Sequence, residues 1–217
     1  MQRISLEESK KIKIFKRFES KYILWEDYVI DFIKLLERDY FLVVDKNQIL
    51  FPYHSLYFDT DKLAMWNDHE NEKQIRQKIR IREYNDNSKF LEIKEKNNEQ
   101  TIKTRIPVES YNIDNETNWI SHNLKYDTRN LSKSLDVKYN RMTFIKKDKT
   151  ERITIDFDLE YYNYHTKKSW KTTINQVIVE IKKSHKENNE VENMLNNKLL
   201  FYKQKYSKYY WGIKKTS

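Results

Sequence analysis

The sequence predicts an α+β protein in which antiparallel strands make up most of the fold and a few helices flank them. Two patterns predict this class. Apolar and charged residues alternate with a period of two over residues 77–84, 90–96 and 101–108, as in half-buried strands. Residues 24–40 and 188–206 instead repeat apolar positions at helical spacing. The 217 residues contain no Pro/Gly/Ser-rich linker, so we expect a single domain over residues 1–217.

The N-terminal part of the chain is expected to contain two strands and two helical segments. These are a strand at 15–23, an amphipathic helix at 24–40, a strand at 53–58 and a helical turn that Thr60 and Asp61 cap and that ends at Trp66. The helix is predicted because Tyr28, Phe32 and Leu35 recur on one side.

The rest of the chain is expected to form a strand meander followed by further strands and a closing helix. The strands are expected at 77–84, 90–96, 101–108, 138–146, 151–159 and 176–182, and the helix at 188–206. The turn at 85–89 is rich in Asn and Asp and suits a hairpin without glycine. Residues 111–135 are polar and of mixed helical character.

One face of the predicted sheet is charged and the other is apolar, because side chains two apart on a strand point the same way. The charged face would carry Glu19, Lys21, Arg80, Arg82, Glu92, Lys94, Lys96, Lys103, Arg105, Arg152, Asp156, Glu180 and Lys182. A single strand of this kind also suits an ordinary sheet whose charged side meets water. So many cations on one open face would repel each other, so we expect the strands to close into an antiparallel β-barrel with a cation-lined lumen.

The amino-acid composition limits which binding partners and which kinds of catalytic or metal site the chain can have. The net charge of +9 favours polyanions: nucleic acid, phosphorylated small molecules, polyphosphate or an anionic membrane surface. The absence of cysteine excludes disulfides, thiolate metal sites and a cysteine nucleophile. A single glycine, Gly212, excludes the glycine-rich phosphate loops, so any phosphate must be bound by side chains.

Other site types are not indicated. The histidines lack the spacing of a zinc or catalytic motif. No apolar run approaches the ~18 residues that cross a bilayer, and residues 1–15 lack a signal-peptide core, so we expect no transmembrane segment and a cytoplasmic protein.

An ordered series of short segments resembles the VTC domain of polyphosphate polymerases, in the triphosphate tunnel (CYTH-like) superfamily. The resemblance covers about residues 15–212 and rests on residues 19–22, 55–60, 78–82, 91–94, 103–105, 139–141, 152–156, 179–182 and 205–209. A single segment such as Glu19-Ser20-Lys21-Tyr22 is weak evidence, whereas the series ending in Ser207-Lys208-Tyr209 is more specific.

The resemblance implies a triphosphate tunnel fold that binds ATP and a divalent metal, Mn²⁺ or Mg²⁺, and transfers the terminal phosphate of ATP to a growing polyphosphate chain. Carried over by position, the phosphate-gripping residues would be Lys21, Arg80, Arg82, Lys94, Lys103, Arg141, Arg152, Lys182, Ser207 and Lys208. Glu180 would be the chief metal ligand. Glu92 and Glu19 would be further metal ligands, or would orient the cations through ion pairs.

Two other functions stay open at this point. A tunnel triphosphatase would use the extra carboxylates Glu19 and Glu92, although cations outnumber acids on the charged face. A non-catalytic polyanion-binding module would need only the positive charge. The aromatic and basic residues at 202–211 would suit single-stranded nucleic acid, but their helical spacing favours core packing with a basic rim, so nucleic acid is not the expected partner.

Overall fold

The structure is a computed structural model that describes residues 1–12, 18–98, 100–172, 175–197, 202–203 and 206–217. The chain divides into two compact units, and two long strands, β8 (Leu131–Lys146) and β9 (Glu151–Asn163), contribute residues to both. Unit 1 consists of Met1–Phe51, Tyr139–Leu159 and Thr172–Tyr206. Unit 2 consists of Pro52–Lys138, Glu160–Lys171 and Ser207–Ser217.

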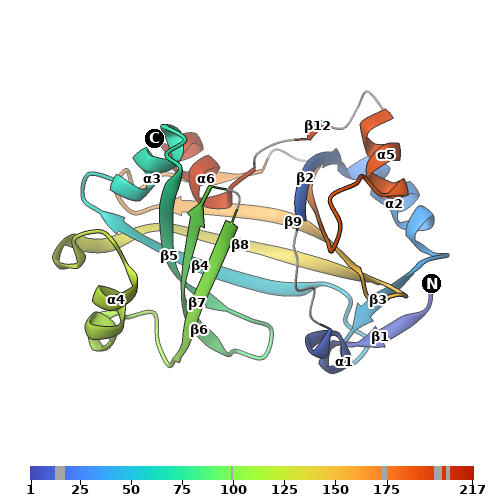
Figure 1. The fold of residues 1–217 in the computed structure, drawn as a ribbon, viewed down its shortest axis with the longest axis horizontal. Helices are drawn as coiled ribbons and strands as arrows, with labels where there is room; N and C mark the ends of the chain where they lie inside the picture. Colours follow the sequence, from blue (N-terminus) through green and yellow to red (C-terminus); the bar gives the residue numbers. More distant parts are fainter. Residues whose placement is uncertain (13–17, 99, 173–174, 198–201, 204–205) are drawn as a thin grey trace. The chain divides into compact units, whose positions relative to one another are not determined.

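Unit 1 is built on the hydrogen-bonded strand order β12-β2-β11-β9-β8, with β3 on β8 and β1 parallel to β3 (Figure 1). Its other elements are β1 (Arg3–Ser5), α1 (Leu6–Lys11), β2 (Phe18–Trp25), a 3₁₀ turn η1 (Glu26–Tyr28), α2 (Val29–Leu36), β3 (Tyr40–Val44), β11 (Gln176–Lys183), α5 (Glu190–Asn197) and β12 (Tyr202–Lys203).

The apolar face of unit 1 forms its core. Phe32 and Leu36 of α2 pack in one cluster with Tyr22 of β2 and Val179 and Ile181 of β11. Alternation turns Glu19 and Lys21 of β2, and Glu180 and Lys182 of β11, to the other side. The sequence periodicity therefore sets which face of this sheet is left for a site.

Unit 2 follows the order β8-β4-β5-β6-β7, and β10 pairs with the last residues of β9 (Figure 1). Its other elements are β4 (Phe51–Thr60, whose first residue belongs to unit 1), α3 (Ala64–Glu70), β5 (Ile75–Glu83), β6 (Lys89–Asn97), β7 (Gln100–Val108), η2 (Asp114–Glu116), α4 (Thr117–Asn123), η3 (Thr128–Asn130), β10 (Ser169–Lys171) and α6 (Lys208–Thr216).

The core of unit 2 lies on the apolar side of β4, β5 and β6. Ile79, Ile81 and Leu91 are fully buried there with Met65 of α3 and Ile120 of α4. This arrangement confirms the α+β class and the meander of three strands expected from the period-two pattern.

Several element boundaries differ from the sequence expectations. The strand expected at 15–23 is confirmed for residues 18–23 and continues to Trp25, and residues 15–17 lie outside the described part. The helix expected at 24–40 is shorter, because residues 24–25 pair in β2 and Tyr40 begins β3. The closing helix expected at 188–206 is wrong as one element: α5 ends at Asn197, and residues 202–203 pair with β2.

The expected closure into a barrel is not seen in the strand pairing. The hydrogen-bonded path runs from β12 to β7, and no pairing among the described residues joins these two strands. The single domain and the closed lumen therefore stay predictions.

Candidate functional site: two charged sheet faces

Unit 2 carries a strongly positive face on the side of its sheet opposite the core. Alternation and strand register bring the side chains of four neighbouring strands together there. We call this the cationic face; its residues are Ser55, Tyr57, Lys78, Arg80, Arg82, Glu92, Lys94, Lys103 and Arg105. Six of these residues are cations and one is a carboxylate, so the face is built to attract anions.

Glu92 organises the cations around it. Its side chain is 1% exposed, and its Oε2 accepts from Arg80 Nε at 3.0 Å and Nη2 at 2.8 Å. Its Oε1 lies 2.5 Å from Lys103 Nζ and accepts from the Tyr84 hydroxyl at 3.1 Å. Burial favours the neutral acid, but the charges of Arg80, Arg82 and Lys103 hold the pKa of Glu92 far below its usual range. Both carboxylate oxygens are thus engaged by protein donors.

A row of three lysines crosses the cationic face. Lys78 of β5 pairs in register with Lys94 of β6, which pairs with Lys103 of β7. Like charges directly opposite one another destabilise a sheet. Burial, together with the charges of the arginines at 80 and 82, lowers the pKa of Lys103 to about 8, although Glu92 opposes this shift. The row is therefore a place where a bound anion would relieve repulsion.

The C-terminal helix adds to the same face. Ser207 caps α6 by accepting from the backbone N–H of Tyr210, and its hydroxyl also accepts from Lys78 Nζ at 2.6 Å. The charge of Lys208 acts on the hydroxyl of Tyr57. Both C-terminal residues predicted for the site therefore lie with the unit 2 cations.

Unit 1 carries a second charged face, on which positive and negative side chains are present in more equal numbers. In register across three strands, Lys21, Glu180 and Thr154 form one row, and Glu19, Lys182 and Arg152 form the next. Arg141 of β8 lies on the same face, where it binds Asp156. We call this the carboxylate face; its residues are Glu19, Lys21, Arg141, Arg152, Thr154, Asp156, Glu180 and Lys182. Its four cations are nearly balanced by three carboxylates.

Glu180 is the centre of the carboxylate face. Its Oε1 lies 3.0 Å from Lys182 Nζ and 3.8 Å from Lys21 Nζ, and its Oε2 lies 3.7 Å from Arg141 Nη2. Burial favours the neutral acid, but Lys182 and Lys21, a hydrogen bond with Glu19 and the charge of Arg141 hold the pKa of Glu180 well below its ordinary value. Glu180 is thus a carboxylate at neutral pH.

The two arginines of this face have strong contacts inside the protein. Arg141 holds Asp156 with two parallel bonds, Nε–Oδ1 at 2.5 Å and Nη2–Oδ2 at 2.8 Å. Arg152 donates through Nη2 to the backbone oxygens of Ser9 at 2.9 Å and Ile12 at 3.2 Å, at the end of α1. In this structure Arg152 therefore ties α1 to the sheet.

The carboxylate face offers a limited set of metal ligands. Among the described residues, no group of three or more His, Cys, Asp or Glu side chains is arranged to hold an ion. Glu180 and Glu19, which lie within hydrogen-bond reach of each other, supply two carboxylates. This donor set fits Mg²⁺ or Mn²⁺ in the manner of sites that use one or two carboxylates plus substrate phosphate oxygens. Glu92, enclosed by its donors, fits a metal less well.

The structure brings the sequence-predicted site residues together in two groups. Arg80, Arg82, Glu92, Lys94, Lys103, Ser207 and Lys208 gather in unit 2, and Glu19, Lys21, Arg141, Arg152, Glu180 and Lys182 gather in unit 1. Lys78 and Tyr57 also lie on the cationic face, although neither was predicted as a site residue. Lys78 could have been predicted from the sequence, because it lies two residues before Arg80 on the same strand and therefore faces the same side as Arg80 and Arg82. Tyr57 could not, because its place opposite Arg80 depends on the β4–β5 register.

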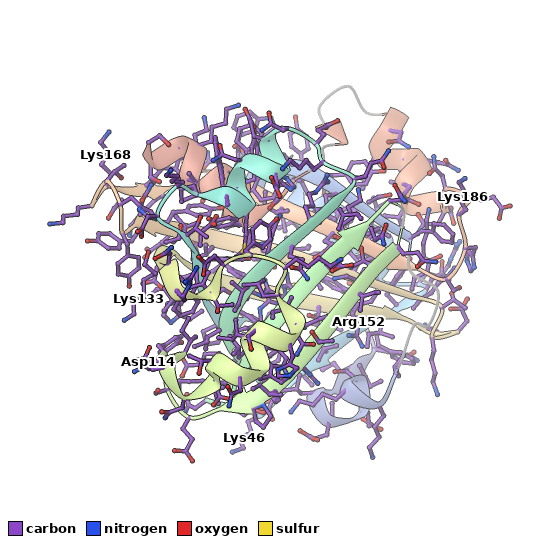
Figure 2. The ribbon with its side chains drawn as sticks, turned by 60° about the vertical axis from the view of Figure 1, so that its left-hand side comes forward. Lys46, Asp114, Lys133, Arg152, Lys168 and Lys186 are labelled. Carbon is purple, nitrogen blue, oxygen red and sulfur yellow. The ribbon has the colours of Figure 1, made fainter. Side chains whose placement is uncertain are left out.

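Not all of the positive charge lies on these two faces. Figure 2 shows Lys168 and Lys186 pointing away from the protein, and both are exposed, as are Lys46 and Lys133. Within the described part of the chain, no helix has the length and apolar character needed to span a membrane.

Two solved structures have a similar fold. One is described as a putative adenylyl cyclase, HpAC1, from Hippeastrum that reveals a dominant triphosphatase activity; it has a TM-score of 0.56 and 12% identity, and the match covers 92% of this chain and 96% of that one. The other is the PH1819 protein from Pyrococcus horikoshii OT3, with a TM-score of 0.53 and 13% identity over 91% of this chain and 99% of that one. No curated protein matches the chain significantly.

These likenesses, at low identity, define the fold class: the chain has the fold of the triphosphate tunnel proteins. The family model of the VTC domain matches residues 16–217, and the chain therefore belongs to the VTC-domain family. The resemblance found in the ordered sequence segments is confirmed.

Proposed function

We propose that this chain is a metal-dependent polyphosphate polymerase that transfers the terminal phosphate of ATP to a growing polyphosphate chain. One observation carries the proposal: in a VTC-domain chain, six cations on three neighbouring strands surround a single buried carboxylate on the cationic face. Such a face suits a ligand with many closely spaced negative charges. Polyphosphate and the triphosphate of ATP both have this form.

The chemistry requires positioning and charge neutralisation more than covalent catalysis. A terminal oxygen of the polyphosphate chain forms a new bond to the γ-phosphorus of ATP. The bond from that phosphorus to the bridging oxygen breaks, and its electron pair leaves with ADP. Arg80 and Arg82 would bind phosphate oxygens through two N–H groups each, and the lysine row would supply point charges.

Glu92 would hold Arg80 and Lys103 in place for this task. Glu180 and Glu19 would hold a Mn²⁺ or Mg²⁺ ion. When bound, such an ion would withdraw negative charge from the phosphoryl group that is transferred.

A triphosphatase is the second candidate. It is favoured by the three carboxylates of the carboxylate face, since hydrolysis needs an activated water as well as bound phosphate. The solved Hippeastrum protein of similar fold is described as having a dominant triphosphatase activity. A module that binds polyanions without catalysis is the third.

One assay separates the three candidates. The purified chain is incubated with ATP and Mn²⁺, and the products are resolved by chain length. We expect ADP together with long-chain polyphosphate. Orthophosphate as the only phosphate product would replace the polymerase with the triphosphatase. No turnover, combined with salt-dependent polyphosphate binding, would support the binding module.

The variant Glu180→Gln tests the metal role in the same assay. It keeps the side-chain shape but removes the charge, so we expect turnover to fall at least about 100-fold while phosphate binding changes little. The matched control is Glu160→Gln, which alters an exposed glutamate paired with Lys171. Full turnover in Glu180→Gln would exclude this residue as the metal ligand.

A further inference from the structure

Strand β4 carries one of the segments that resemble the VTC domain, and the mechanism above gives it no role. Two of its side chains, Ser55 and Tyr57, are buried on the cationic face, directly opposite Arg82 and Arg80 in register. Ser55 Oγ accepts from Arg82 Nε at 3.3 Å. The hydroxyl of Tyr57 accepts from Arg80 Nη1 at 2.9 Å.

The ring of Tyr57 is held by a residue of the C-terminal helix α6. It stacks on the ring of Tyr209 of α6, with centroids 4.9 Å apart and an interplanar angle of 24°. The hydroxyl of Tyr209 donates to Asp59 at 2.5 Å, and Asp59 is completely buried. The Asp59 carboxylate also accepts from the backbone N–H groups of Met65 and Trp66, both at 3.0 Å. The chain of contacts is therefore anchored in α3 and α6.

These contacts hold the Arg80 guanidinium from two sides. Glu92 binds its Nε and Nη2, and Tyr57 binds its Nη1. A guanidinium held in this way loses less side-chain entropy when it binds an anion than a mobile one does. Burial would raise the pKa of Tyr57, but Arg80 and Arg82 lower it, which agrees with a hydroxyl oxygen that faces positive charge.

We propose that Tyr57 is a positioning residue for phosphate binding: its hydroxyl oxygen fixes Arg80, and the stacked ring of Tyr209 fixes Tyr57. The phosphate part of this inference rests on the proposed function. Tyr57 acts through Arg80 and needs no contact of its own with the ligand.

A double-mutant cycle tests this coupling, with inorganic tripolyphosphate as the probe in titration calorimetry. Tyr57→Phe removes only the hydroxyl, and we expect tripolyphosphate to bind about fivefold more weakly, the effect of losing one hydrogen bond to a charged group. In an Arg80→Ala background the same change should alter binding less than about twofold, because the partner is gone.

The matched control is Tyr126→Phe. It also removes a tyrosine hydroxyl that binds a carboxylate within unit 2, but that hydroxyl donates to Asp68 at 2.6 Å and lies outside the contacts that hold Arg80. We expect its affinity to stay within about twofold of the wild type, with circular dichroism reporting the fold of each variant.

The outcomes separate this inference from the proposed function. If Tyr57→Phe weakens binding equally with and without Arg80, or no more than Tyr126→Phe does, the positioning role is overturned while phosphate binding stands. If the wild-type chain does not bind tripolyphosphate, both the positioning role and the proposed function are contradicted.

Discussion

At the scale of single residues, two buried glutamates have different surroundings. Glu92 is enclosed by Arg80, Lys103 and Tyr84, so its charge is used within the protein. Glu180 also faces cations, but it lies beside a second carboxylate, Glu19. We therefore propose that Glu180 binds a metal ion together with Glu19, whereas Glu92, whose oxygens are both engaged, holds its donors in place.

The variant Glu92→Gln tests the role of the first glutamate. Removing its charge leaves Arg80 and Lys103, which are both partly exposed, without their counterion and weakens their hydrogen bonds to a buried group, so we expect a loss of about 1–3 kcal/mol in the free energy of unfolding. Urea denaturation measures this loss. The control Glu160→Gln breaks an exposed pair with Lys171 and should change stability by less than about 1 kcal/mol. Equal effects in the two variants would show that Glu92 does not organise the face.

The proposed binding of phosphate is expected to depend on pH through Lys103. Its pKa in the free protein is about 8, so the lysine is charged below that pH and loses its proton above it. An anion binds the charged form better, so affinity for tripolyphosphate should be fully present below pH 8 and fall as pH rises through 8, by up to about tenfold at pH 9.

The variant Lys103→Arg stays charged over this range and serves as the reference. Calorimetric titrations from pH 7 to 9 should show that the ratio of wild-type to variant affinity declines as the pH rises. Because both proteins bind the same ligand at each pH, the ligand's own titration cancels in this ratio. A constant ratio would mean that the protonation of Lys103 does not control binding.

At the scale of secondary structure, the C-terminal helix α6 is packed tightly at its single glycine. A Cβ added at Gly212 would lie 2.4 Å from Leu135 Cδ2 and 2.5 Å from Tyr161 Cδ1. Helix propensity alone would make Gly212→Ala stabilising by about 1 kcal/mol. The overlap should dominate, and we expect the variant to lose about 1–3 kcal/mol on denaturation. A gain in stability would show that α6 is less closely packed.

The long strands were predictable from the sequence, whereas the short strands β1, β3, β10 and β12 and the two ends of the chain were not. The meander at 75–108 alternates with a period close to two, most clearly in the middle of β5 and β6, where one face is buried and the other charged. The helix α1 was missed because it is only six residues long. The helix expected at 188–206 was wrong because apolar spacing extended over a stretch whose later residues, 202–203, pair with β2.

The candidate site was predictable to the same extent as the strands. The alternation of side chains along a strand was enough to predict that Arg80 and Arg82 face the same side of the sheet, and likewise Glu180 and Lys182. Register was needed to see that Lys78, Lys94 and Lys103 form one row and that Tyr57 faces Arg80, and single-strand patterns contain no register.

At the scale of the whole molecule, the net charge of +9 is distributed unevenly. The cationic face of unit 2 concentrates charge of one sign, the carboxylate face of unit 1 is nearly balanced, and exposed lysines such as Lys168 and Lys186 make up part of the remainder (Figure 2). Placement therefore matters more than total charge, because only the concentrated cations can grip a chain of phosphates at close range.

We propose that the cationic face binds the phosphate chain, and a comparison of two lysine variants of equal charge tests this directly. Lys94 is exposed on that face and Lys186 is exposed outside both charged faces, so neither replacement by glutamine should disturb the core. Calorimetry with inorganic tripolyphosphate at two salt concentrations gives the affinity and its salt dependence. We expect Lys94→Gln to bind tripolyphosphate about fivefold more weakly, with a smaller salt dependence, and Lys186→Gln to match the wild type. Equal losses in both variants would contradict this proposal, because binding would then follow net charge alone.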